Sequence, residues 1–118
     1  MNDEETIQAI EVDIKEATAA VEYAKALDKL ERYHPFKKII LEGYFKEEAI
    51  KLVGTKSANG YEDEASQKAI IKAIDGIGEL AKYLQTIKTL GRMNEKAIQE
   101  NEAALEEILH QDNGGGIH

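Results

Sequence analysis

The chain has 118 residues, of which 42% are hydrophobic and 32% charged, and it contains no cysteine and a single proline. Without cysteine it has no disulfide, catalytic thiol or thiolate-ligated metal, and no apolar run comes near the roughly 20 residues of a membrane-spanning helix. The net charge of −8 argues against a phosphate-binding surface over most of the molecule, so neither nucleic acid nor a membrane is expected as a partner. Ala, Glu, Lys, Leu and Gln are good helix formers and supply much of the chain, which favours helices over sheets. We therefore expect an all-α protein.

The first predicted helix covers residues 3–33. Asn2 or Asp3 resembles an N-cap, and Glu5 places a carboxylate in the first turn. The apolar positions that follow alternate between spacings of three and four residues, which is typical of a helix that packs along another helix. These positions are Ile7, Ile10, Ile14, Ala17, Val21 and Ala24. The His34-Pro35 step is expected to end the helix, because the residue before a proline is pushed away from the α region.

The second predicted helix covers residues 35–53 and has the least regular apolar pattern. Pro35 suits its first turn, where a missing N–H has no partner to lose. Gly54 is expected to end it, and the stretch from Gly54 to Glu64 is typical of a loop in which Asn59-Gly60 suits a positive φ. Aromatic residues gather around this helix, which indicates core packing or, as the sharper alternative, an exposed partner-binding patch. Four lysines make it the only basic element: Lys37, Lys38, Lys46 and Lys51.

The third predicted helix covers residues 63–110. Glu62, Asp63 and Glu64 favour a helix N-terminus through the helix dipole. No proline interrupts the segment, which would be about 70 Å long if continuous, although Gly91 leaves a bend or break open. The tail at residues 111–118 contains three consecutive glycines and is expected to be flexible.

Together these elements predict a single helical domain, residues 1–118. It is a helical hairpin extended by one long C-terminal helix, elongated, and packed as an antiparallel bundle or coiled coil. The first two helices are too short to lie alongside all of the third, so in an up-down-up arrangement its part from about residue 84 overhangs. The apolar seam of that part would face water unless another chain covered it, so we predict an association interface there. The interface residues are Leu84, Ile87, Gly91, Asn94, Ile98, Asn101, Leu105 and Ile108.

Three positions of this seam are not hydrophobic, namely Gly91, Asn94 and Asn101. A glycine allows two helix backbones to approach closely, and an asparagine at a seam restricts register and oligomer number at some cost in stability. We therefore interpret the asparagines as specificity devices. The alternative is a locally wet seam at a frayed helix end.

No catalytic, cofactor-binding or metal-binding residue is predicted. Glu31 with His34 and Glu107 with His110 have the Glu-x-x-His spacing of di-iron bundles, but further inward carboxylates are lacking and a solvated helix face explains both pairs. The GIG tripeptide at 76–78 lacks the preceding strand and the lysine of a phosphate loop, and neither serine stands in a nucleophile motif. We expect a protein that is not an enzyme and takes no small-molecule substrate.

The segments HPFKKIILEGYFKEEAIKLVG and IGELAKYLQTIKTLGRMNEKAIQENEAALEEI, within about residues 30–109, resemble small helical proteins that tailed bacteriophages encode among their virion-morphogenesis genes. The resemblance implies a non-enzymatic structural or assembly protein and supplies no catalytic residues. We expect it to form homo-oligomers or to dock on a larger phage structural protein. The acidic N-terminus lacks the apolar core of a signal peptide, so we expect the host cytoplasm and, in addition, the virion as its locations. The alternative is an acidic helical inhibitor or decoy that binds a host protein, with an association that weakens steeply with salt.

Overall fold

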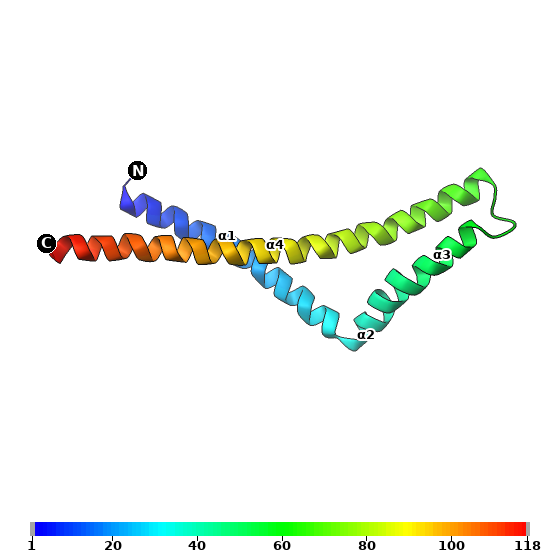
Figure 1. Cartoon of the computed structure of the whole chain (residues 1–118), viewed down its shortest axis with the longest axis horizontal. Coiled ribbons are helices and arrows are strands. Elements are labelled where there is room, and N and C mark those ends of the chain that lie inside the picture. The colour runs from blue at the N-terminus through cyan, green and yellow to red at the C-terminus, as the bar shows by residue number, and fades with distance from the viewer. Residues whose placement is uncertain (1, 118) are drawn as a thin grey trace. The chain divides into compact units, whose positions relative to one another are not determined.

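Figure 1 shows the computed structural model of the chain, which describes the backbone of residues 2–117 and the side chains of residues 2–111. Every element in the described range is helical, so the predicted all-α class is confirmed. In chain order the elements are α1 (Asp3–Arg32), α2 (His34–Phe36), the π-helix η1 (Lys37–Glu48), α3 (Ala49–Lys56) and α4 (Glu64–Ile117). A helical hairpin is formed by α3 and the N-terminal part of α4, which lie on either side of one loop (Figure 1).

The first helix, α1, begins with a side-chain cap. The Asn2 Oδ1 atom accepts a hydrogen bond of 2.8 Å from the Glu5 N–H, so Asn2 rather than Asp3 is the capping residue. The helix ends at Arg32, and Tyr33 is extended, with φ −76° and ψ 118°. We expected the break at His34, but His34 is already helical and places Pro35 in the first turn of α2, where its missing N–H leaves no carbonyl without a partner.

We expected one α-helix over residues 35–53, but the middle of this segment is not α-helical. Residues 37–48 form a π-helix of 12 residues, in which backbone hydrogen bonds span five residues instead of four. Gly43 lies in this π-helix, and a Cβ there would stand 3.2 Å from the Lys38 carbonyl oxygen, five residues earlier. A residue without a side chain therefore fits where the π-helical turn brings this carbonyl close.

The loop after α3 begins later than expected. α3 continues through Gly54 to Lys56, and its end is marked by Ser57, whose N–H bonds to the Gly54 carbonyl at 3.2 Å. Gly60 has a φ of 93°, as its place after Asn59 predicted. The Gln67 side-chain amide donates hydrogen bonds to two backbone carbonyls that the loop separates, that of Lys56 at 2.9 Å and that of Tyr61 at 2.7 Å. These bonds tie the end of α3 and a residue within the loop to one side chain of α4.

The N-terminus of α4 is capped by Asp63, whose Oδ2 atom accepts a hydrogen bond of 2.9 Å from the Ser66 N–H. From Glu64 the helix continues for 54 residues without a break at Gly91, a length of about 80 Å at 1.5 Å per residue. It runs to Ile117 and thus beyond the end expected near residue 110, while the flexibility expected for residues 111–118 stays a prediction. The glycines weaken a helix there, but no proline removes a backbone donor. His118, the last residue of that tail, lies outside the described residues.

The chain folds into two compact units, and each is described by itself. The first contains α1 up to Lys25 and α4 from Ile87 onward, and the second contains residues 26–86. The sequence predicted a single domain, and both units draw on α1 and α4. The buried hydrophobic residues are Ile10, Ala17 and Ile87 in the first unit and Leu27, Ile70 and Ile77 in the second. Among the described residues no side chain is below 2% exposed, so neither unit has a deep core.

Candidate association surface

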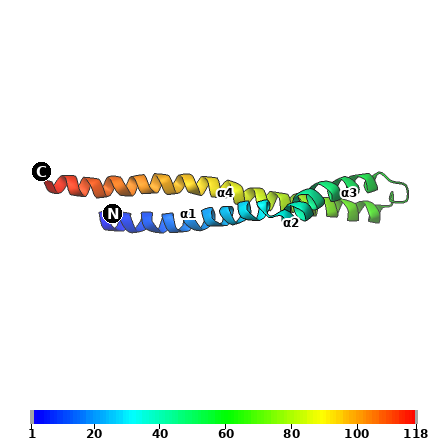
Figure 2. The same ribbon diagram turned by 90° about the horizontal axis from the view of Figure 1, so that it is seen from below.

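At Gly91 the helices α1 and α4 of the first unit approach each other closely. This glycine is buried, and a Cβ added to it would collide with the Cβ of Ala24 and stand 4.0 Å from the Ala20 carbonyl oxygen. Figure 2 shows the N-terminal part of α1 alongside the C-terminal half of α4. The glycine of the predicted seam therefore serves a close contact between two helices of the same chain.

The rest of the predicted interface is also turned away from solvent. Ile87 is buried like Gly91, and the remaining positions are half-buried: Leu84, Asn94, Ile98, Asn101, Leu105 and Ile108. On α1, Ile10 and Ala17 are buried, and the other seam positions are half-buried: Ile7, Ile14, Val21 and Ala24. All of these residues except Leu84 lie in the first unit. In this unit the regular three-four spacing of each helix thus marks the face that it turns to the other.

The overhang from which we predicted the interface is absent from the first unit. We had expected α4 beyond residue 84 to face water, whereas α1 up to Lys25 forms one compact unit with α4 from Ile87 onward. The error lay in placing both shorter helices against the same half of the long one. A contact between these seam residues and another chain stays a prediction.

The two seam asparagines bond within their own helix. The Asn94 Nδ2 atom donates to the Leu90 carbonyl at 2.7 Å, and the Asn101 Nδ2 atom donates to the Ala97 carbonyl at 2.9 Å. Each bond reaches back four residues, as short polar side chains do in helices. The Nδ2 donor of each amide therefore has an acceptor within its own helix, and the role of the asparagines in setting register stays a prediction.

Large hydrophobic side chains are more often exposed than buried among the described residues. Six hydrophobic residues are buried, whereas 13 large ones are exposed. In the first unit the exposed ones are Val12, Tyr23, Leu90, Met93 and Leu109. In the second unit they are Leu30, Tyr33, Ile39, Ile50, Val53, Tyr61, Ile71 and Tyr83.

The second helical segment carries the most exposed of these side chains, but they are not its aromatic ones. Phe36, Tyr44 and Phe45 are half-buried, and the Tyr44 and Phe45 rings contact each other with centroids 5.9 Å apart. Ile50 and Val53 instead reach 72% and 58% exposure on α3. The aromatic and basic residues of this segment indicate a partner-binding patch in the sequence, but they do not identify Ile50 and Val53 as its exposed residues. Their spacing of three, out of phase with the half-buried Leu52 of α3, was the available signal.

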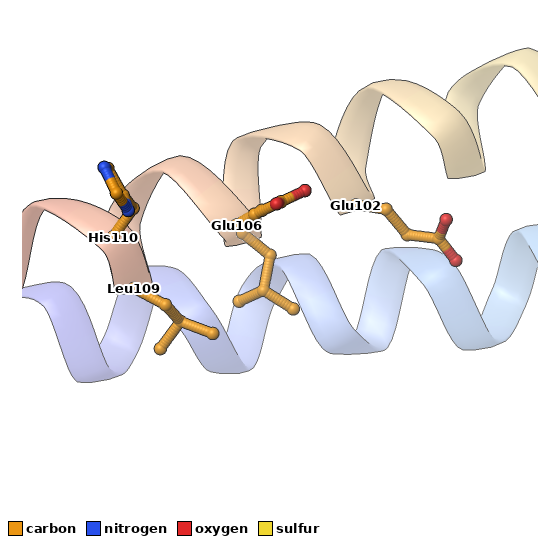
Figure 3. A pocket seen from close by; sticks show the side chains of 5 residues that line it. Glu102, Glu106, Leu109 and His110 are labelled. Atoms are coloured by element: carbon orange, nitrogen blue, oxygen red, sulfur yellow. The ribbon is translucent and has the colours of Figure 1, made fainter. Parts of the chain in front are cut away.

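A second exposed feature lies near the C-terminal end of α4. There a shallow hollow of about 330 Å³ is lined by Glu102, Leu105, Glu106, Leu109 and His110. Figure 3 shows Glu102, Glu106 and Leu109 following one another along α4, with Leu109 directed toward the α1 ribbon and the His110 ring turned away from it. All the lining residues belong to one helix, so the hollow is an open groove on a helix surface and does not enclose a small ligand.

The groups weighed for metal binding do not converge in the part of the chain that the structure describes. His34 and both members of the Glu107–His110 pair are exposed, Glu31 is half-buried, and no group of three or more ligand-type side chains stands together there. Of the two serines, Ser66 donates its N–H to the Asp63 cap. None of the described helices combines the length and apolar character that crossing a membrane requires.

Comparison with known proteins adds no relative. No protein-family model matches the chain, and no curated protein or solved structure matches it significantly. The resemblance to phage morphogenesis proteins therefore stays a prediction, and the function has to be argued from the exposed apolar and charged surfaces described above.

Proposed function

We propose that the protein is a non-enzymatic phage structural or virion-assembly protein that acts by binding other helices, either in homo-oligomers or on a larger phage structural protein. The observation that carries the proposal is the excess of exposed over buried large hydrophobic side chains. The resemblance of residues 30–109 to phage morphogenesis proteins supplies the biological setting. In this setting the protein acts in the host cytoplasm and as part of the virion, without cofactor or small-molecule substrate.

The free energy gained by burying these exposed side chains can offset the free-energy cost of association. Full burial of one Ile, Val or Met side chain contributes about 1.5–3 kcal/mol. Association itself costs about 4–15 kcal/mol of lost freedom, so several of these side chains have to be buried together. The exposed residues occur on α1, η1, α3 and α4, and a partner that contacts more than one helix reaches enough of them.

Self-association is tested by measuring the molar mass of the purified protein by light scattering, from dilute to concentrated solution. We expect the mass to rise above that of one chain, and Met93→Asp to lower it, because Met93 is 61% exposed and supports little of the chain's own fold. Gln99→Asp is the matched control, since Gln99 is an exposed polar residue of the same helix. A Met93→Asp variant with the mass of the wild type at every concentration would argue against this helix as an association surface.

The proposed role in virion structure or assembly is tested with an antibody against the chain. We expect the antibody to detect the protein in purified virions or in assembly intermediates from cells that produce them. An enzyme or a host-directed decoy would be found in the cell and missing from both particles. Absence from both kinds of particle would contradict the proposal.

A further inference from the structure

A solvent-exposed side of α4 in the first unit carries two large apolar side chains among basic ones. Leu90 and Met93 lie one turn apart and are 46% and 61% exposed. The stretch around them, residues 82–96, holds four bases against one acid. Its bases are Lys82, Lys88, Arg92 and Lys96, and its acid is Glu95. We call Leu90 and Met93, with the exposed Arg92 and Lys96 that flank them, the basic stripe.

A solvent-exposed side of α1 in the same unit carries apolar side chains among acidic ones. Val12 is 53% exposed, and Ala9, one turn before it, is exposed as well. Both lie two residues from seam positions of α1, about half a turn around the helix, and so point away from α4. Over residues 3–22, α1 has seven acids and a single base. We call Ala9 and Val12, with the exposed Glu5 and Glu11, the acidic stripe.

The helix beside the acidic stripe in the same chain does not neutralise its charge. Ala24 meets Gly91 where α1 and α4 pack antiparallel, so residues 4–17 lie beside residues 98–111 (Figure 2). Residues 98–111 carry four glutamates and neither lysine nor arginine. The fold thus sets acids beside acids at this end of the first unit.

The apolar residues of the two stripes fit each other when two copies of the chain lie antiparallel. With Leu90 on Val12 of a second copy, Met93 lies on Ala9, because three residues forward on one helix match three residues back on the other. In each pair a larger side chain meets a smaller one, as interdigitating helices require. Burial of Leu90 and Met93 supplies the apolar part of the affinity.

The charged residues of the two stripes are opposite in sign in the same arrangement. Arg92 lies beside Glu11 of the second copy, and Lys96 lies beside its Glu5. Lys96 also contacts Glu100 of its own helix at 4.0 Å, but exposed pairs of this kind are weak and leave it able to serve a second carboxylate. A parallel arrangement would put Arg92 and Glu11 on opposite sides of the contact. The charge pairs therefore favour antiparallel helices.

Neighbouring registers oppose the apolar residues to carboxylates. A shift of one heptad in one direction sets Leu90 on Glu5, and a shift in the other direction sets Met93 on Glu16. Each shift buries a carboxylate against an apolar side chain, which costs free energy. The register with Leu90 on Val12 avoids both.

We propose that the basic stripe of one copy of this chain packs antiparallel on the acidic stripe of a second copy. The proposal rests on the proposed function and names the contact through which self-association operates. Charge complementarity selects a second copy as the occupant, because the same chain carries both a positive and a negative stripe. The two stripes are different surfaces, so one copy can bind two neighbours and the assembly can grow beyond a dimer.

Engineered disulfides test the register directly, because the chain has no cysteine of its own. In the proposed contact, position 97 of one copy lies opposite position 5 of the other, whereas a parallel contact would set it opposite position 16. We expect a mixture of Ala97→Cys and Glu5→Cys to form a disulfide-linked dimer under mild oxidation. It should form about tenfold faster or more than with Glu16→Cys, the matched control, because the contact raises the effective concentration of the two thiols.

Charge reversals test the same contact through the molar mass measured by light scattering. Arg92→Glu leaves the acidic stripe intact, and Glu11→Arg leaves the basic stripe intact. Each variant alone should show a dissociation constant for self-association raised about tenfold, because a like-charge pair replaces an opposite one. An equimolar mixture of the two should restore association, since each altered or intact stripe then finds the opposite charge in the other variant.

Matched controls separate this contact from a general effect of net charge. Lys72→Glu and Glu107→Arg reverse exposed residues of α4 outside both stripes and change the net charge by the same amounts as the test variants. Both should retain the wild-type mass. Circular dichroism of all variants should show unchanged helix content, because the reversed side chains are exposed.

Three results would overturn the inference, and they differ in what they mean for the proposed function. Equal cross-linking of Ala97→Cys with Glu5→Cys and Glu16→Cys would remove this contact and leave association through other surfaces standing. Control reversals that dissociate as far as the test variants would reduce the effect to net charge. A wild type with the mass of one chain at every concentration would overturn both this contact and self-association, while detection in virions would still support docking on a larger partner.

Discussion

The α1–α4 contact of the first unit and the 34–56 segment of the second unit show two ways in which a helical sequence distributes its apolar residues. On α1 a strict alternation of three and four keeps six residues on one face, and all six are buried or half-buried. In the 34–56 segment the apolar residues have no single period, twelve residues adopt a π-helix, and Ile39, Ile50 and Val53 stay exposed. Regular spacing thus predicts an internal contact, and its absence leaves apolar side chains exposed.

The largest change in stability is expected for Gly91→Leu, in the α1–α4 contact of the first unit. The Cβ of the new side chain would collide with the Cβ of Ala24, and no side-chain rotation relieves that contact, so the two helices have to separate. We expect a loss of about 3 kcal/mol in the free energy of unfolding, measured by urea denaturation followed by circular dichroism.

Gly78→Leu is the control for this variant, because a Cβ at Gly78 meets nothing within 4 Å. Both substitutions replace a glycine by a good helix former within α4, so they differ mainly in the space around the side chain. Equal unfolding free energies for the two variants would mean that the α1–α4 contact does not depend on a small residue at Gly91.

The sequence predicts the features that depend on residue type and short-range spacing, and it does not predict those that depend on longer-range contacts. The seam of α1 and α4 was found because each residue in it obeys one short-range rule, and the positive φ of Gly60 was found because glycine favours it. The partner of the seam was missed, because spacing tells which face is covered and does not tell by which helix. The π-helix was missed because it follows from a hydrogen-bond pattern that no residue type marks. The shallow hollow near the C-terminal end of α4 was missed because it comes from the surface relief of side chains along the helix.

Two glycine-to-alanine substitutions test the 34–56 segment, and we expect them to change the free energy of unfolding by less than Gly91→Leu does. Gly78→Ala should raise the free energy of unfolding by about 1 kcal/mol, because Ala is the better helix former and the site is open. Gly43→Ala should raise it less or lower it, because its Cβ would press on the Lys38 carbonyl in the π-helix. Thermal unfolding of both variants measures the difference. Equal gains would mean that the π-helical turn accommodates a side chain without strain.

The smallest effect is expected at the N-terminus of α4, where Asp63 caps the helix after the loop. Hydrogen bonds from the Ser66 side chain and backbone hold the pKa of the Asp63 carboxyl below its ordinary value. A group whose pKa is lower in the folded chain stabilises it above the unfolded pKa, near pH 4, and loses this contribution as the pH falls through the folded value. The melting temperature of the wild type should therefore fall more steeply below about pH 4 than that of Asp63→Ala, which lacks the cap at every pH. Asp75→Ala, which removes an exposed carboxylate of α4 beyond its first turn, should keep the capping contribution of the wild type. If Asp63→Ala and the wild type lost stability in parallel over this range, the hydrogen bonds to Ser66 would not contribute to the start of α4 in solution.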